Sequence, residues 1–190
     1  LYESDHLSYF KTHYYGGIKK YQWVALPLAL HGVVVKKDGT TVTLNIGDKP
    51  GDPVFYISDL LIHLAADQMG KTAAKVIEGD SLNIIIGSEP KKDTDKDPVK
   101  TAILDILKEQ YSIDEEDFIS AELEAVPAGH ARDLGFDRSM IMGYGHDDRV
   151  CAYPSMAAVL NYEGTPEYTL AAVLTDKEEI GSVGATGMGA

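Results

Sequence analysis

Residues 21–46 read YQWVALPLALHGVVVKKDGTTVTLNI, an apolar stretch followed by a turn and an alternating stretch. The composition of Tyr21–Lys36 predicts a strand, in which Pro27 marks a bend or an edge position because proline donates no ladder hydrogen bond. The turn has an Asp-Gly pair at its tip, and Thr41–Ile46 alternates between polar and apolar residues. The stretch therefore predicts a β-hairpin, and we expect the first half of the chain to be β-rich.

Two helices are expected after the hairpin. Ser58 is suited to cap a helix in SDLLIHLAADQ, and Asp97 is suited to cap a second helix that begins at Pro98. The apolar positions in each segment recur with helical spacing and predict one buried face per helix. For the first helix these residues are Leu60, Leu61, Leu64 and Ala65, and for the second they are Val99, Ile103, Ile106 and Leu107.

Two further strands and one loop complete the first part. Ser81–Gly87 is a predicted strand, and so is Asp117–Val126, whose apolar face carries Ile119, Ala121, Leu123 and Ala125. The charged segment Ser88–Pro98 between them is expected to be a solvated surface loop. We place a domain boundary near Ala131.

From about Arg138 the order changes to a loop with acids, a helix and a strand. We expect the helix over Pro154–Tyr162 and a buried strand over Tyr168–Leu174. Acidic residues and glycines follow this strand at once. The order predicts a β-α-β unit, as in an α/β sheet whose strands are buried on both faces.

Composition excludes several classes of protein. Thirty acidic residues against 17 basic ones give a net charge of −13, which argues against nucleic-acid binding because that needs a basic face. A single cysteine excludes a disulfide scaffold and a Cys-rich zinc module. No apolar run approaches the length of a membrane span, and the N-terminal residues lack a secretion-signal pattern. A reducing cytoplasm is therefore the expected compartment.

Two acidic pairs point to a divalent-metal centre. Asp147 and Asp148 lie in GYGHDDRVCAYPS, and Glu178 and Glu179 lie in LTDKEEIGS. The two pairs are separated by about one helix-plus-strand crossover, so both can face one site at the edge of a sheet. Neighbouring carboxylates repel each other unless a metal ion or a shared proton compensates.

Each pair also has a simpler interpretation. Asp147 is a candidate to bridge two cations, with Asp148 and Arg149 orienting neighbouring groups, yet the same residues suit an exposed surface turn equally well. One of Glu178 and Glu179 can bind metal while the other takes a proton from water, or both can be first-turn acids of a helix. Spacing leaves these alternatives open.

Two other features near the acidic pairs are expected to be structural. Cys151 is predicted to be a small core residue and not a nucleophile, because nearby carboxylates raise the pKa of a thiol. The glycine-rich end GSVGATGMGA follows two glutamates that would repel a pyrophosphate, so we do not expect a dinucleotide site there. Close packing of a helix start on a sheet accounts for the glycines.

Taken in order, four segments resemble one known family. HDDR, followed by a helix and DKEEIGS, is similar to the RLDN and DNEEVGS segments of the aspartyl aminopeptidase / aminopeptidase I family of dinuclear zinc peptidases. THYYGGIKKYQW resembles that family's YGGGIW segment, and ISDLLIHLA resembles its IPHLAIHL. The EEIGS element is shared with related zinc aminopeptidases, so the ordered set carries the resemblance.

The resemblance implies roles for four residues. Asp147 would bridge two metal ions, Glu179 would be a terminal metal ligand and Glu178 would be the general base. His63 would reach the active site of a neighbouring subunit of a homo-oligomer and help to bind the peptide substrate. The implied cofactor is zinc, two ions per active site, with cobalt or manganese as alternatives.

The implied fold is α/β. Residues 1–131 would form a β-rich inserted domain that serves dimerisation. Residues 132–190 would form part of an α/β/α sandwich catalytic domain. The implied function is a metal-dependent aminopeptidase that acts on peptides, with no nucleic-acid or membrane partner.

The chain also departs from the family pattern. The family's WFDRD segment reads WVALP here, which puts a preference for acidic N-terminal residues in doubt. The family's HTDSP segment, with its first metal-binding histidine, has no counterpart, so we expect this chain to be an internal portion of a longer protein. The alternative function is a non-catalytic oligomerisation or peptide-binding module that retains vestigial site residues.

Overall fold

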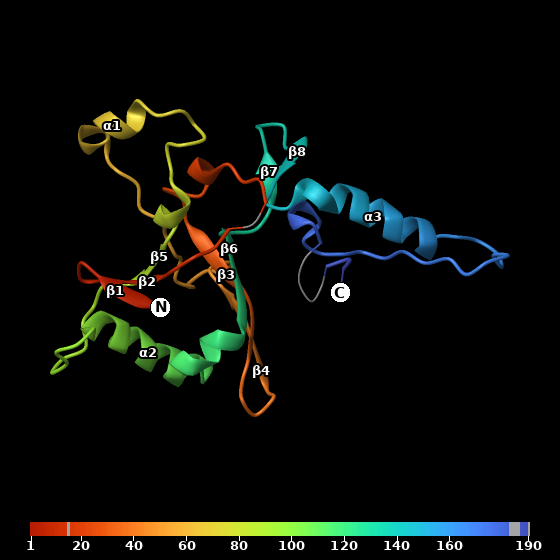
Figure 1. Ribbon diagram of the computed structural model, residues 1–190. Helices are drawn as coiled ribbons and strands as arrows, with labels where there is room; N and C mark the ends of the chain where they lie inside the picture. The colour runs from red at the N-terminus through yellow and green to blue at the C-terminus, as the bar shows by residue number, and fades with distance from the viewer. Residues whose placement is uncertain (15, 183–186, 190) are drawn as a thin grey trace. The chain divides into compact units, whose positions relative to one another are not determined.

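The computed structural model describes residues 1–14, 16–182 and 187–189, and it shows a mixed α/β protein (Figure 1). The chain divides into two compact units. Unit 1 comprises residues 1–14 and 19–130, and unit 2 comprises residues 131–190 with the short stretch that precedes Lys19. Assignment of these units to an oligomerisation domain and a catalytic domain stays a prediction. Within the described ranges, no helix is long and apolar enough to cross a membrane.

Unit 1 contains the predicted hairpin at the centre of an antiparallel sheet. Strand β3 (Leu28–Val35) pairs with β4 (Thr41–Ile46) on one side and with β6 (Ala121–Pro127) on the other. The hairpin is confirmed, but its first strand is shorter than predicted, since residues 21–27 form no strand. Strand β3 starts directly after Pro27, which has no N–H to donate, and the N–H of Leu28 donates a hydrogen bond to the Phe55 carbonyl (2.9 Å).

A second antiparallel sheet of unit 1 has the order β1-β2-β5. Its strands are β1 (Tyr2–Ser4), β2 (Leu7–Phe10) and β5 (Ile84–Gly87). The predicted strand over Ser81–Gly87 is therefore present in its second half, and a 3-10 turn over Gly79–Ser81 replaces its start. Helix α2 (Pro98–Tyr111) packs on all three strands.

Helix α2 begins at Pro98 as predicted, but Asp97 does not cap it through its side chain. Asp97 has a left-handed backbone (φ +47°) and forms no side-chain cap bond; its carbonyl instead accepts a hydrogen bond from the Thr101 hydroxyl (2.9 Å). Val99 and Leu107 are buried as expected, whereas Ile106 is 43% exposed. Of the four residues predicted to form the buried face, Ile106 is the one that is exposed.

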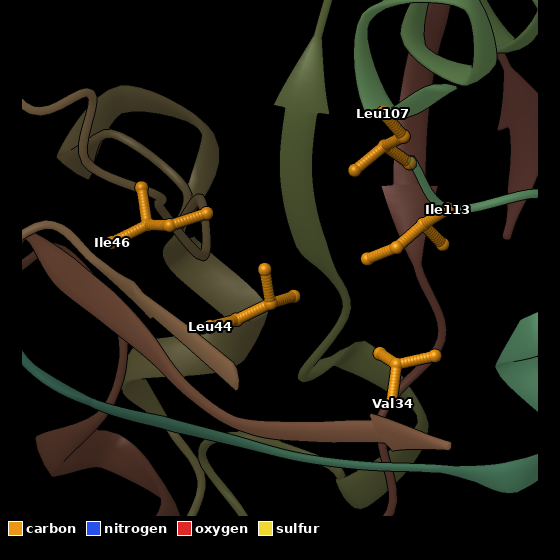
Figure 2. Packing of buried hydrophobic residues seen from close by; sticks show 5 residues of the cluster. All are labelled: Val34, Leu44, Ile46, Leu107 and Ile113. Atoms are coloured by element: carbon orange, nitrogen blue, oxygen red, sulfur yellow. The ribbon is translucent and has the colours of Figure 1, made fainter. Parts of the chain in front are cut away.

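An apolar cluster joins the central sheet to the end of α2. It joins side chains from β3, β4, the end of α2 and the residue that follows α2 closely (Figure 2). All of them are less than one-tenth exposed, so removing one leaves a cavity that typically costs about 2–5 kcal/mol. The members are Val34, Leu44, Ile46, Leu107 and Ile113.

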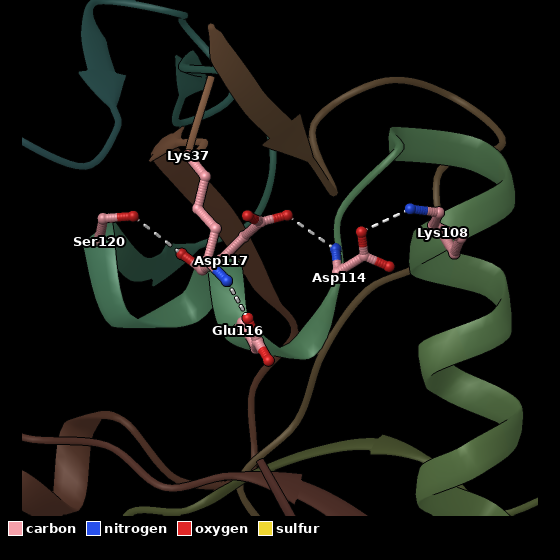
Figure 3. Close-up of polar contacts among 6 residues, drawn as sticks. All are labelled: Lys37, Lys108, Asp114, Glu116, Asp117 and Ser120. Atoms are coloured by element: carbon pink, nitrogen blue, oxygen red, sulfur yellow. Dashed lines mark hydrogen bonds and ion pairs between the residues drawn. The ribbon is translucent and has the colours of Figure 1, made fainter. Parts of the chain in front are cut away.

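A capped 3-10 turn connects α2 to β6 and corrects one prediction. Glu115–Ser120 is a 3-10 helix, so the predicted strand over Asp117–Val126 begins only at Ala121. The backbone N–H of Asp114 donates to the carboxylate of Asp117 (2.9 Å), which is one half of a capping box (Figure 3). Acidic residues in the first turn favour the helical conformation over the apolar alternation that predicted a strand.

Asp48 holds two loops of unit 1 against β3. Its carboxylate contacts the His31 ring (Nε2–Oδ2 2.7 Å) and accepts a hydrogen bond from the backbone N–H of Gly129 (3.0 Å). The Gly129 N–H is the main reason why the pKa of Asp48 lies below its ordinary value, and His31 lowers it further. Asp48 therefore remains charged at neutral pH and fixes the end of unit 1.

The expected helix after Ser58 is wrong. The segment contains a 3-10 turn over Ile62–Leu64 and a single α-helical turn, α1 (Ala66–Met69), and neither is capped by a side chain. Of its predicted stripe, Ala65 is buried and the three leucines are more than half exposed. A helix this short gains stability only from packing, and the three exposed leucines do not supply it.

Unit 2 begins with a small hairpin and continues into a long helix. Strands β7 (Arg132–Leu134) and β8 (Met140–Met142) are antiparallel, and α3 runs over His146–Leu160. Helix α3 includes most of the predicted Pro154–Tyr162 helix but starts eight residues earlier.

The expected buried strand over Tyr168–Leu174 is wrong for this structure. Its backbone is irregular, and Tyr168 and Val173 are 77% and 80% exposed. A strand needs a neighbour for its backbone hydrogen bonds, and no strand of the described part pairs with this segment. The predicted β-α-β unit is therefore absent from the described residues, and part of the predicted glycine-rich helix start (residues 183–186) lies outside them.

Gly32 offers a test of the central sheet. An alanine Cβ there would lie 2.0 Å from the carbonyl oxygen of Glu122, and the Gly32 backbone has φ +143°. We expect Gly32→Ala to lower the free energy of unfolding by more than about 3 kcal/mol, since the β3–β6 pairing must shift. Urea denaturation followed by circular dichroism measures this change.

The matched control is Gly39→Ala at the hairpin tip. Gly39 also has a positive φ (+82°), but its Cβ position meets no atom within 4 Å. The expected cost is about 1–2 kcal/mol, from backbone strain. Equal losses for the two variants would contradict the close-approach argument.

Candidate metal centre

The first acidic pair, Asp147 and Asp148, closely follows a turn formed by Gly145. Gly145 precedes α3 with a left-handed backbone (φ +81°), and a Cβ there would lie 2.0 Å from Nη1 of Arg149. That nitrogen donates a hydrogen bond to the Gly145 carbonyl (2.9 Å). Arg149 therefore stabilises the loop before the helix. From the sequence, Arg149 was instead a candidate to orient a neighbouring side chain.

Asp147 and Asp148 lie within the assigned range of α3 but are not helical. Asp147 has φ −89° and ψ 113°, Asp148 has φ −116° and ψ 32°, and the peptide bond between them is cis. Both side chains are exposed. The pair is thus presented at a kink beside a glycine turn, in keeping with the irregular loop expected for Asp147.

Cys151 lies in α3 shortly after this pair, and its position differs from the prediction. It is exposed, not a core residue, because helix α3 presents this face to solvent in the described structure. The thiol donates a hydrogen bond to the Asp148 carboxylate, and this contact with the nearby negative charge raises the pKa of Cys151. The expected direction of the pKa shift is confirmed, and the raised pKa disfavours Cys151 as a nucleophile.

The second acidic pair sits on one 3-10 turn, Glu178–Ile180. Left-handed residues flank the turn, Lys177 with φ +59° and Gly181 with φ +82°, and the Gly181 N–H donates to the Glu178 carbonyl (2.9 Å). Both glutamate side chains are exposed. The sequence left two conformations open for this pair, an extended chain and the first turn of a helix. The structure shows neither: the pair lies on a tight 3-10 turn, and both carboxylates are accessible.

The acid that precedes this pair, Asp176, forms an ion pair of its own. Asp176 pairs with Lys177, with 3.1 Å between Oδ2 and Nζ. The Lys177 side chain is only 15% exposed, so this pair anchors the approach to the turn.

The candidate site has side chains of the type that binds zinc, but too few of them. These side chains are Asp147, Glu178 and Glu179. Exposed carboxylates are suitable ligands or proton acceptors beside zinc. Among the residues described, however, no three or more histidine, cysteine, aspartate or glutamate side chains lie close enough to hold a metal ion. A catalytic zinc usually has three protein ligands, so the roles of these residues remain predictions.

His63 lies in unit 1, at the centre of the 3-10 turn Ile62–Leu64. Its neighbours Leu61, Ile62 and Leu64 are 58–67% exposed. The sequence singled out His63 and predicted that Leu61 and Leu64, but not Ile62, would lie on the buried face of a helix. The exposed apolar side chains instead form a loop surface around the histidine, which we name the His63 loop (residues 60–69).

The pairing of His31 with Asp48 was not expected from the sequence. The two residues are 17 positions apart, and the β3–β4 register places His31 opposite Asn45, whereas Asp48 lies in the loop after β4. The contact therefore depends on the path of that loop, which no local sequence pattern indicates.

Comparison with known proteins identifies relatives along nearly the whole chain. The family model of the aminopeptidase I zinc metalloproteases (M18) matches residues 2–190. A probable M18 family aminopeptidase 1 from Clostridium acetobutylicum is 61% identical over 189 residues, which make up 99% of this chain and 40% of the relative. One from Thermotoga maritima is 50% identical over 187 residues, or 98% of this chain and 41% of the relative.

Solved structures agree with these relatives. The crystal structure of an M18-family aminopeptidase from Thermotoga maritima matches with a TM-score of 0.89 and 49% identity, over 98% of this chain and 40% of that chain. Aminopeptidase I from Clostridium acetobutylicum matches with a TM-score of 0.85 and 56% identity, over 98% and 41%. This chain therefore spans about 40% of the length of the curated relatives it matches.

The contact between Cys151 and Asp148 makes a pH-dependent prediction. Because the negative carboxylate disfavours the thiolate, the rate of Cys151 alkylation by iodoacetamide should reach half its maximum above the pH of an ordinary cysteine, about 8.5. Asp148→Asn should move that midpoint to lower pH. Asp133→Asn, which removes an exposed acid of β7, is the control and should leave it in place. An unchanged midpoint in Asp148→Asn would rule out the contact.

Proposed function

This chain belongs to the aminopeptidase I (M18) family of zinc metalloproteases, and we propose that the whole protein is a metal-dependent aminopeptidase that removes N-terminal residues from peptides. One observation carries the proposal: the family match spans residues 2–190 and includes both acidic pairs. The alternative of a non-catalytic module is not favoured by relatives that are named aminopeptidases.

The proposed cofactor is zinc, two ions per active site. The family is described as zinc metalloproteases, and exposed carboxylates are ligands that zinc accepts, as do cobalt and manganese. Asp147 would bridge the two ions and Glu179 would be a terminal ligand. We propose that residues of the whole protein outside this chain complete the ligand set, because the described residues contain too few ligands.

Zinc, when bound, lowers the pKa of water and polarises a carbonyl group. Glu178 would act as the general base by accepting a proton from water at its carboxylate. The same carboxylate could then give that proton to the amine that leaves. The exposed position of Glu178 on a turn supports this role, since a base must reach solvent and substrate.

The proposed placement of the units follows the family resemblance. Unit 1 would be the inserted dimerisation domain, and unit 2 would be part of an α/β/α sandwich. The segment Tyr168–Leu174 supports this proposal, because an apolar and exposed stretch of this kind is suited to pair within a larger sheet.

The His63 loop supports a homo-oligomer. Leu60, Leu61, Ile62, Leu64 and Met69 are each more than half exposed within ten residues. A concentration of large apolar side chains on a loop marks a surface that another protein covers. We propose that a second copy covers it and that His63 thereby enters the partner's active site, where it binds the peptide or stabilises the oxyanion.

The general-base role of Glu178 can be tested by substitution. In the whole protein, Glu178→Gln should reduce peptide hydrolysis by at least about 100-fold, the size of a general-base contribution. Zinc content should be unchanged, because glutamine removes the base and leaves the ligands. Hydrolysis of aminoacyl substrates and metal analysis by mass spectrometry measure the two quantities.

Two other substitutions separate a base from a ligand. Glu179→Gln should lower zinc content as well as activity, and Glu167→Gln, an exposed acid of unit 2, should change neither. Retention of more than a few percent of activity in Glu178→Gln would exclude it as the general base.

The proposed role of His63 has a separate test. His63→Phe should lower kcat without changing zinc content or oligomer mass, because the apolar loop surface remains while the imidazole is lost. Steady-state kinetics, metal analysis and light scattering check the three quantities. Kinetics equal to those of the unaltered protein would remove His63 from the site.

A further inference from the structure

A pocket of about 390 Å³ in unit 1 has an unusual charge. Three lysines line it, Lys20 from one segment and Lys71 and Lys75 from another more than 50 residues later. Within the described part of the chain, Glu78 is its one acidic lining residue. In a protein with 30 acidic and 17 basic residues, such a convergence gives a local positive potential against the overall charge.

The lysines are held by specific contacts. Lys20 is half-buried, its ammonium group lies 5.5 Å from the centre of the Tyr14 ring, and it contacts the carbonyl oxygen of Ala74 (3.5 Å). Lys71 pairs loosely with Glu78 (3.4 Å). Lys75 forms no ion pair with another described residue. One ammonium group is therefore positioned, one is partly compensated and one is available to a ligand.

The pocket wall is closely packed where the two segments meet. Ile77 is only 6% exposed and anchors the second segment in the core of unit 1. Gly79 lies against Tyr14 so closely that a Cβ would be 2.6 Å from the ring carbon Cε1. The ring that orients Lys20 therefore rests on Gly79, and the lysines converge because the fold fixes both segments.

We propose that this pocket binds an anion with two or more adjacent negative charges. Lysine ammonium groups bind phosphate and carboxylate as point charges, and the pocket volume is within the range of small-molecule sites. Phosphate groups of a small molecule and neighbouring acidic side chains of a peptide share this chemistry. The proposal concerns unit 1 and does not depend on the peptidase function.

Isothermal titration of the whole protein with sodium pyrophosphate and with triglutamate tests the proposal. We expect at least one probe to bind, more weakly as salt is added. Lys75→Gln should weaken that binding about fivefold, as for loss of one exposed charge pair. Glu78→Gln should strengthen it by a few-fold, because the acid facing the anion is neutralised while the pocket shape is kept.

Lys92→Gln is the matched control, since it removes the same charge from an exposed loop outside the pocket. Binding of pyrophosphate with this pattern identifies a phosphate ligand, and binding of triglutamate identifies an acidic peptide. No binding of either probe at about 10 mM overturns the proposal. Equal effects of Lys75→Gln and Lys92→Gln, or weaker binding in Glu78→Gln, overturn it as well.

Discussion

The pairing of β3 with a strand on each side is the constraint on which unit 1 depends. Its backbone satisfies hydrogen bonds toward β4 and β6 at once, and Val34 of β3 belongs to the apolar cluster that Leu107 joins from the end of α2. Gly32 is required because the Glu122 carbonyl occupies the space of a side chain. The contacts of Asp48 with His31 and Gly129 then fix the loops at the ends of this sheet.

The two acidic pairs of unit 2 depend on local backbone geometry. Asp147 and Asp148 follow a left-handed glycine, and Glu178 and Glu179 lie between two left-handed residues. These turns keep the carboxylates accessible, as a metal ligand or a proton acceptor requires. They do not by themselves bring the pairs together, since that needs the strands of a sheet, and Tyr168–Leu174 has no partner in the described residues.

Prediction from sequence worked where short-range chemistry decides the structure. The Asp-Gly turn located the β3–β4 hairpin, and Pro98 located the start of α2. Prediction from sequence failed where the apolar periodicity competed with helix capping or was not matched by burial. Apolar alternation predicted a strand over Asp117–Ser120, but the acids around Asp114 cap a 3-10 turn there. The His63 loop has a helical apolar pattern, but its leucines stay exposed and only short turns form.

The sequence by itself determined the family, the hairpin, the start of α2 and the identity of the candidate site residues. Each follows from neighbouring residues in a fixed order, which the chain carries without folding. Only the tertiary structure decided that the leucines of the His63 loop are exposed, that β6 completes the central sheet and that Lys20 meets Lys71 and Lys75. These features join segments far apart in sequence, and their energies depend on packing and desolvation that no local pattern records.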